Sequence, residues 1–272
     1  RRAARIFPAL IVVVLVTVFA IGPIFTTLSV GDYFGSPGTW KYLSVMLLSS
    51  TENVLPGVFE GLPYPAAVNG SLWTLRYEFL MYLIVPFADF ILARFGNKAR
   101  KPATYAFLAI LVLGYCLSSA GLLHLPEAIK IGLRLGSYFF VGCVVYDRGL
   151  DRYFDAQYSI VALLLVLVFA QESGPLCPLL MLLATTICVF GFALAPQPRF
   201  AKCFSKNDFS YGVYIWAFPI QQALVQIGGS SQGSVLLYSA VAFAVTLVFA
   251  IASWFLVEKP CMTWGKKLSK RF

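Results

Sequence analysis

Apolar runs long enough to cross a lipid bilayer constrain this chain more than any other feature. A transmembrane helix needs about 20 mostly apolar residues, within a range of about 17–25. Scanning with such a window predicts eight spans, at residues 8–30, 71–93, 103–123, 129–146, 157–171, 176–195, 209–227 and 234–257. The fourth and fifth runs are short, and the chain contains no internal repeat. We therefore predict an all-α, polytopic membrane helix bundle in which residues 1–272 form a single domain.

Composition supports the same class of protein. Charged residues make up 12% of the chain, whereas a soluble domain contains about 25%. The mean hydropathy of +0.79 excludes a disordered, collagen-like or disulfide-scaffold chain. The six cysteines are scattered without a C-x-x-C pair, and we interpret them as packing residues. They are Cys116, Cys143, Cys177, Cys188, Cys203 and Cys261.

The basic residues predict the orientation of the chain. If Arg1 is cytoplasmic and the eight spans alternate, 17 of the 21 Lys and Arg residues fall on the inner side. This matches the positive-inside rule and places both termini in the cytoplasm. The net charge of +9 then requires no nucleic-acid partner, because the basic residues do not form one patch.

The outer connection at residues 31–70 is unusually long. Connections longer than about 12–15 residues are often functional. Its aromatic and carboxylate side chains fit either an interfacial belt or carbohydrate binding. They belong to Asp32, Tyr33, Trp40, Tyr42, Glu52, Glu60 and Tyr64. Within the connection, residues 42–49 predict a short helix lying in the interface.

Polar residues inside the second span are functional candidates, because they are costly in a membrane. Seven residues separate Ser71 from Glu78, which places Glu78 roughly 10 Å into the membrane at 1.5 Å per helical residue. Thr74 and Tyr82 share a helix face with Glu78. Glu78 either lines a substrate cavity or forms a structural ion pair with a basic residue, such as Arg76 or Arg134.

Other polar residues carry weaker signals. Arg134, in the fourth span, either pairs with a carboxylate or extends outward to the interface. Asp89 lies near the inner interface and receives no role. The single histidine, His124, is interpreted as an outer-loop residue. Residues 69–71 match a glycosylation sequon, a short pattern that also occurs by chance.

Several segments, taken together, resemble the acyltransferase-3 family of integral membrane O-acyltransferases. Four of them carry the resemblance: Arg2-Ala3-Ala4-Arg5-Ile6-Phe7-Pro8; Asn69-Gly70-Ser71-Leu72-Trp73-Thr74-Leu75 with Glu78 and Tyr82; Phe209-Ser210-Tyr211-Gly212-Val213-Tyr214-Ile215-Trp216 with Phe218-Pro219; and Val257-Glu258-Lys259-Pro260. Residues 134–142 are similar to a further F-x-x-G segment of the family. The order and spacing of these segments agree over essentially the whole chain.

The chain departs from the family pattern in two places. Family members begin with two further helices, which carry the histidine assigned as catalytic, so a ten-helix core is expected for the full protein. Because the first residue here is Arg1, we expect an N-terminally truncated chain that is nearly inactive alone, and His124 is no substitute. In addition, Ala217 stands where the family usually has histidine.

The resemblance implies transfer of an acyl group, commonly acetyl from cytoplasmic acetyl-CoA, to a hydroxyl of a cell-surface or lipid-linked glycan. It implies that Glu78 orients the base or contacts the acceptor. Arg2 and Arg5, three residues apart, are expected to bind the CoA phosphates through arginine forks. Cavity-lining roles are expected for Ser71, Trp73, Tyr82, Arg134, Tyr211, Tyr214 and Trp216. Acyl-CoA is the expected co-substrate, with no metal and no bound cofactor, and the expected location is the bacterial inner membrane.

Two other functions stay open at this point. A secondary transporter would use Glu78 and Arg134 as substrate or proton sites, although the chain lacks paired, broken helices in two similar halves. A non-catalytic membrane subunit of a polysaccharide export or modification system would explain the missing histidines.

Overall fold

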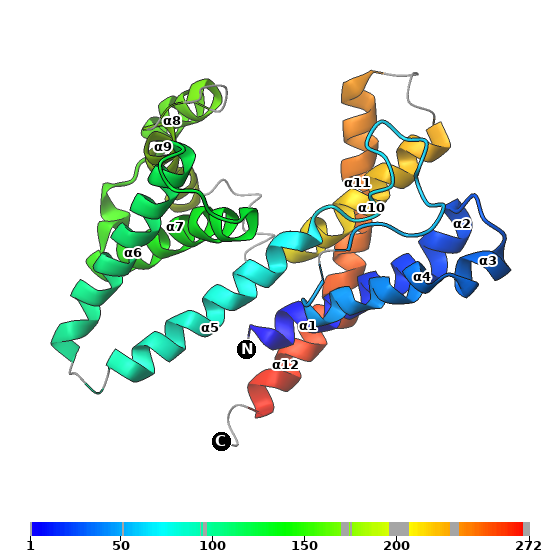
Figure 1. Ribbon diagram of the computed structural model, residues 1–272, viewed down its shortest axis with the longest axis horizontal. Coiled ribbons are helices and arrows are strands. Elements are labelled where there is room, and N and C mark those ends of the chain that lie inside the picture. The colour runs from blue at the N-terminus through cyan, green and yellow to red at the C-terminus, as the bar shows by residue number, and fades with distance from the viewer. Residues whose placement is uncertain are drawn as a thin grey trace. The chain divides into compact units, whose positions relative to one another are not determined.

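The computed structural model describes residues 2–50, 52–92, 94, 97–169, 174, 176–195, 207–228 and 234–268. Helices dominate these residues, and they contain no strand beyond two isolated bridges, Thr26 with Val58 and Val54 with Ala67. The longer helices are α1 (Ala3–Val16), α5 (Leu75–Leu92), α6 (Asn97–Ser119), α7 (Glu127–Arg148), α8 (Ala156–Phe169), α9 (Cys177–Leu194), α10 (Ser210–Gly228), α11 (Val235–Ser253) and α12 (Lys259–Leu268). The all-α fold class is therefore confirmed (Figure 1).

Each of the eight predicted spans contains a helix. Five helices in the described part of the chain are long and apolar enough to cross a membrane: Ala3–Phe25, Pro102–Ser119, Glu127–Arg148, Cys177–Leu194 and Val235–Lys267. The other three are α5, which carries Arg76, Glu78 and Asp89, α8, which has only 14 residues, and α10. Membrane crossing by these three stays a prediction.

Contacts divide the chain into two compact units. Unit 1 contains Arg1–Arg76 and Phe200–Phe272, and unit 2 contains Tyr77–Arg199. The two ends of the chain therefore build one unit, and the middle builds the other. The prediction of a single domain over residues 1–272 stays untested.

The core of unit 1 is built partly from the long connection after the first span. This connection contains α3 (Val30–Gly35), α4 (Pro37–Lys41) and the 3-10 helix η2 (Tyr42–Leu47), and the 3-10 helix η3 (Leu72–Thr74) follows it. Its apolar side chains pack with residues of α1 and α10 in one buried cluster. Because Tyr33 and Tyr42 are fully buried, the interpretation of the connection as an interfacial belt or sugar-binding surface is wrong for these two residues. Trp40 and Tyr64 are exposed.

Tyr33 supplies a hydrogen bond that a proline in the first span cannot donate. After α1 the helix widens into a π-helical turn, Thr17–Ile21, where the Gly22 N–H bonds the carbonyl of Thr17. In this register the partner of the Val18 carbonyl would be Pro23, which has no N–H. The Tyr33 hydroxyl instead donates to that carbonyl at 2.9 Å. Burial raises the pKa of Tyr33 to about 12, so the phenol stays protonated as a donor.

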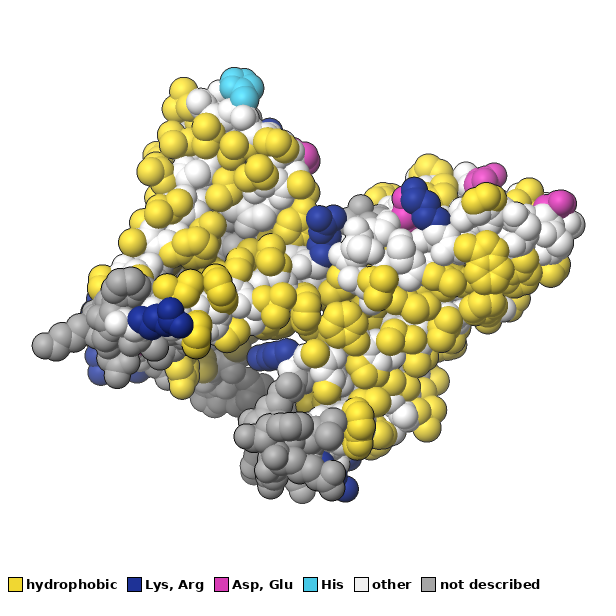
Figure 2. Space-filling view, turned by 60° about the horizontal axis from the view of Figure 1, so that its bottom comes forward, with side chains coloured by type: hydrophobic (Ala, Val, Ile, Leu, Met, Phe, Trp, Pro, Cys, Tyr) yellow, Lys and Arg dark blue, Asp and Glu magenta, His cyan; other side chains and the backbone are white. Residues whose placement is uncertain are grey.

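Unit 2 is built from helix pairs. Helix α6 packs on α7, and α8 packs on α9. The buried cluster here is small and centres on Met81, Leu111 and Phe140. Many large apolar side chains of α8 are exposed, and Figure 2 shows hydrophobic side chains covering much of the surface in view. Such a surface is typical of a protein whose solvent is lipid.

The described cysteines are free and partly buried. Cys203 lies outside the described residues.

Candidate functional site

Three of the family-like segments meet at one end of unit 1. The Arg5 guanidinium forms an ion pair with Asp208, with Nη2 at 2.7 Å from Oδ2. The same Nη2 donates to the Ser210 hydroxyl at 3.4 Å, and that hydroxyl donates to Asp208 Oδ1 at 2.6 Å. We name Arg5, Asp208 and Ser210 the Arg5 cluster. It joins the start of α1 to the start of α10.

Neighbouring contacts strengthen this junction. The Tyr211 hydroxyl donates to the carbonyl of Ile6 at 2.9 Å. Arg2 lies at the N-cap position of α1 with an exposed side chain, and its carbonyl accepts from the backbone N–H groups of Arg5 and Ile6. Arg2, Arg5 and Tyr211 therefore lie at one end of unit 1. Their roles in binding acyl-CoA stay predictions.

Two acidic residues of this end were missed as sequence-based candidates. Asp208 directly precedes the Phe209–Trp216 segment, and an Asp before a helix start is a capping signal that would have identified it. Glu258 is fully buried and accepts a hydrogen bond from the Ser253 hydroxyl at 2.8 Å. Its Oε2 has no hydrogen-bond partner among the described residues. The position of Glu258 in the Glu-Lys-Pro motif could have identified it as a candidate from the sequence.

The Arg5 cluster makes stability depend on pH. Partial burial acts to raise the pKa of Asp208, but hydrogen bonds from Ser210 and the Arg5 charge outweigh it and lower the pKa below its ordinary value. A lowered folded-state pKa stabilises the fold above the unfolded value of about 3.9, and this contribution is lost as pH falls through the folded value. We expect the melting temperature in detergent to fall below about pH 4 by more in the wild type than in Asp208→Asn.

The matched control for that measurement is Arg5→Lys, which keeps a cation beside Asp208 and should retain the acid-dependent loss. Equal acid-dependent losses in wild type and Asp208→Asn would contradict this assignment.

A second group of predicted residues meets where the Asn69–Leu75 segment reaches α10. The Tyr214 hydroxyl donates to the carbonyl of Ser71 and lies 2.5 Å from the Thr74 hydroxyl. The buried Asn69 donates through Nδ2 to the Ile215 carbonyl at 2.9 Å, and its Oδ1 accepts from the Ser71 N–H at 3.2 Å. Ser71 and Tyr214 are thus in contact, and Ser71 takes part through its backbone carbonyl and N–H groups.

Asn69 supplies a hydrogen bond that a second proline, in α10, cannot donate. In α10 the usual partner of the Ile215 carbonyl is the N–H of residue 219, but residue 219 is proline and has none. The Asn69 amide takes that place. The segment that resembles the family's Ser-Leu-Trp motif therefore completes the hydrogen bonds of the helix that carries Trp216 and Pro219.

The two predicted tryptophans differ in their surroundings. Trp73 lies in η3 and is partly buried. Trp216 is buried, packs on Phe249 with ring centroids 5.2 Å apart, and has an Nε1 without a hydrogen-bond partner among the described residues. Ala217, at the position where the motif resemblance predicts histidine, is partly buried next to it. The cavity-lining roles of Trp73 and Trp216 stay predictions.

Glu78 and Tyr82 lie together on α5, as their spacing predicted. The exposed Glu78 carboxylate accepts a hydrogen bond from the Tyr82 hydroxyl at 2.6 Å. The Tyr82 ring in turn makes an edge contact with Phe139 of α7, at a centroid distance of 5.7 Å. Tyr82 is thereby fixed from one side and can hold the orientation of the carboxylate.

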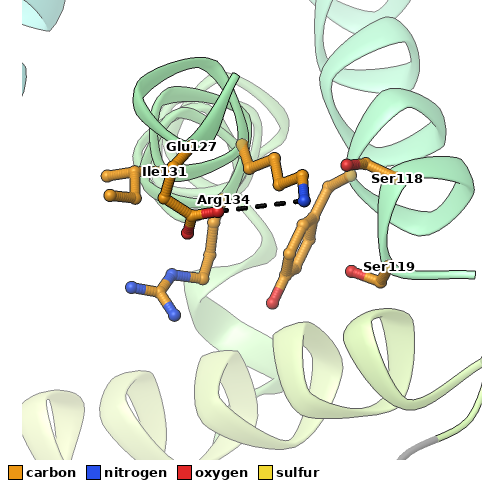
Figure 3. A pocket seen from close by; sticks show the side chains of 7 residues that line it. Ser118, Ser119, Glu127, Ile131 and Arg134 are labelled. Carbon is orange, nitrogen blue, oxygen red and sulfur yellow. Dashed lines mark ion pairs between the residues drawn. The ribbon is translucent and has the colours of Figure 1, made fainter. Parts of the chain in front are cut away.

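Arg134 is exposed on α7 and lines a pocket of about 360 Å³ between α6 and α7 (Figure 3). His124 is exposed in the connection between the same two helices. The described residues contain no group of three or more His, Cys, Asp or Glu side chains able to hold a metal ion. The side chain of Asp89 lies outside the described part of the chain.

The fold is that of a multi-pass helical membrane protein. A family model described as "Acyltransferase domain" matches residues 1–255. An O-acetyl transferase of Shigella phage Sf6 is 30% identical over 277 residues, covering 97% of this chain and 76% of the relative. No solved structure matches the chain. The chain therefore belongs to the acyltransferase-3 family of integral membrane O-acyltransferases, and the resemblance of its motifs is confirmed.

Proposed function

We propose that this protein transfers an acetyl group from cytoplasmic acetyl-CoA to a hydroxyl of a cell-surface or lipid-linked glycan. The observation that carries the proposal is the match over 97% of the chain to a protein described as an O-acetyl transferase. The proposed location is the bacterial inner membrane, with both chain ends in the cytoplasm. The distribution of Lys and Arg residues supports this orientation.

The proposed reaction is an acyl transfer between sulfur and oxygen. The acceptor hydroxyl attacks the thioester carbonyl, a C–O bond forms, the C–S bond breaks, and CoA leaves as the thiol. The hydroxyl must lose its proton during the attack, and a positioned general base typically contributes about 10²–10⁴-fold to such a step.

Glu78 is proposed to contact the acceptor hydroxyl or to orient the base that takes its proton. The hydrogen bond from Tyr82 at 2.6 Å supports this role, because it holds an exposed carboxylate in one orientation. Positioned groups of this kind contribute by holding the reactants in the reactive geometry.

Arg2 and Arg5 are proposed to bind the phosphates of the donor. The contacts of Arg5 with Asp208 and Ser210 both use Nη2, so Nε and Nη1 lie outside these two contacts. A guanidinium fixed in this way loses less side-chain entropy when it binds phosphate. Arg2, one helical turn earlier, adds a second positive charge at the same end of unit 1.

The test uses membranes containing the protein expressed from its complete gene, supplied with radiolabelled acetyl-CoA. Base-labile label in extracted glycans is the expected result, and Glu78→Gln is expected to reduce it about 10²-fold or more. Asp155→Asn is the matched control, because it removes an exposed carboxylate of unit 2 to which no role is assigned. Absence of label from folded wild type, or equal label in wild type and Glu78→Gln, would overturn the corresponding part of the proposal.

A further inference from the structure

The pocket between α6 and α7 has the composition of a binding site for a small anion-bearing molecule. The side chains lining it belong to Tyr115, Ser118, Ser119, Glu127, Lys130, Ile131 and Arg134. The first three come from the end of α6 and the others from the first turns of α7 (Figure 3). Its volume of about 360 Å³ lies at the lower end of the range for small-molecule sites, about 300–1,000 Å³.

The charges in the pocket favour an anion. Lys130 and Arg134 are four residues apart on α7 and therefore share a face of the helix. Glu127 is the single carboxylate among the lining residues. Its Oε2 lies 3.8 Å from the Lys130 nitrogen, in a pair with exposed side chains. A weak, exposed pair of this kind leaves the Lys130 charge available to a ligand.

Ser118 supplies an independent sign of a missing ligand. Its side chain is 8% exposed, and its hydroxyl oxygen has no hydrogen-bond partner among the described residues. Buried polar groups in folded proteins are nearly always hydrogen-bonded, so an unpartnered hydroxyl in a pocket wall needs an explanation. A bound molecule that accepts a hydrogen bond from Ser118 would provide it.

We propose that this pocket binds the phosphate ester of a polyol. The phosphate would accept charge-assisted hydrogen bonds from Arg134 and Lys130 and a further one from the Ser118 hydroxyl. The Glu127 carboxylate would accept a hydrogen bond from a hydroxyl of the polyol, which explains why an acidic side chain lies among the cations. Tyr115 and Arg134 line the same pocket, so the phenol is a further hydrogen-bonding group available to the ligand.

Two sources offer this chemistry at this position. The pocket lies at the ends of two helices that are long and apolar enough to cross a membrane, Pro102–Ser119 and Glu127–Arg148, and we expect such helix ends at the membrane–water interface. A phosphoglycerol lipid headgroup and a soluble polyol phosphate can both reach such a place. The proposal concerns binding alone and does not rest on acyl transfer, so its failure would be distinct from failure of the proposed function.

The test measures binding to the purified full-length protein. One arm titrates glycerol 3-phosphate in detergent, with glycerol as the uncharged comparison. The other arm uses native mass spectrometry to measure retention of phosphatidylglycerol against phosphatidylcholine after release from nanodiscs. Binding of glycerol 3-phosphate identifies a soluble polyol phosphate as a ligand, and selective retention of phosphatidylglycerol alone identifies the headgroup.

Arg134→Gln is expected to weaken the observed binding about tenfold or more, since a hydrogen bond to a charged group is worth about 1.5–3 kcal/mol and 1.4 kcal/mol is tenfold. Ser118→Ala is expected to weaken it severalfold without unfolding the protein, because the hydroxyl it removes is unpartnered. Arg148→Gln is the matched control, because it removes an exposed arginine at the opposite end of the same helix. Binding in neither arm, or equal losses in Arg134→Gln and Arg148→Gln, would overturn the proposal.

Discussion

Asn69→Ala is expected to destabilise the protein by about 1–3 kcal/mol, the cost of leaving a buried polar group unsatisfied. Asn69 is 1% exposed, and its amide bonds the carbonyl of Ile215 at 2.9 Å. No backbone N–H at residue 219 can replace it, because that residue is Pro219. The measurement is thermal or denaturant unfolding of the purified protein in detergent.

A second substitution tests the reason for this effect. Pro219→Ala restores the N–H that would bond the Ile215 carbonyl within α10. In the Asn69→Ala/Pro219→Ala double variant, this carbonyl regains a partner, so the combined loss should be smaller than the sum of the single losses. Such non-additivity is the mark of two residues acting on one group.

Two further variants sharpen this test. Asn69→Asp keeps an acceptor for the Ser71 N–H but cannot donate when ionised, so it should be as harmful as Asn69→Ala or more so. Gln221→Ala removes an exposed amide from the same helix and should change stability by no more than about 0.5 kcal/mol. A double variant with strictly additive losses would contradict the proposed partnership of Asn69 and Pro219.

The second large effect is expected at Gly212, where α10 crosses α11. A Cβ atom added to Gly212 would lie 2.9 Å from the Cα and 3.0 Å from the carbonyl oxygen of Ala250. Both are backbone atoms of α11, so the clash cannot be relieved by rotating a side chain. Small residues at such crossings allow close backbone approach in membrane proteins.

Gly212→Ala is therefore expected to lower stability by about 1–3 kcal/mol, and Gly212→Leu by more, as overpacking does in well-packed cores. Gly228→Ala, in the same helix, is the matched control, because an added Cβ there has no neighbour within 4 Å. That substitution should be neutral or stabilising by up to about 1 kcal/mol through helix propensity. A Gly212→Ala protein that unfolds at the wild-type temperature would refute the close crossing.

Hydrophobic runs predicted the helices well because a membrane span must be apolar along most of its length. This signal consists of residues that are consecutive in the sequence, so it can be recognised without knowledge of distant contacts. The spacing of Glu78 and Tyr82 was equally local, since four residues make one turn of a helix. The family-like motifs located the polar segments that meet in unit 1. These features needed no knowledge of distant contacts.

The sequence did not predict which distant residues meet. Asn69 and Ile215 are 146 residues apart, and Arg5 and Ser210 are 205 apart. The aromatic residues of the long connection led to a wrong interpretation of Tyr33 and Tyr42 as interfacial or sugar-binding residues. An amphipathic Tyr is equally suited to an interface and to a core in which its hydroxyl has a partner. Tyr33 is such a core residue, and only the π-helical turn beside it shows why.

The division of unit 1 between the two chain ends has a consequence for biosynthesis. A ribosome adds about 5–20 residues per second, so Asn69 is made roughly 7–30 s before the Ile215 carbonyl to which it bonds, 146 residues later. During that interval the core residues of α1 and of the connection lack α10, against which they pack. A chain released before α10 would leave these groups uncovered and would be recognised by membrane proteases, so degradation of truncated products is expected to depend on whether translation has passed Ile215.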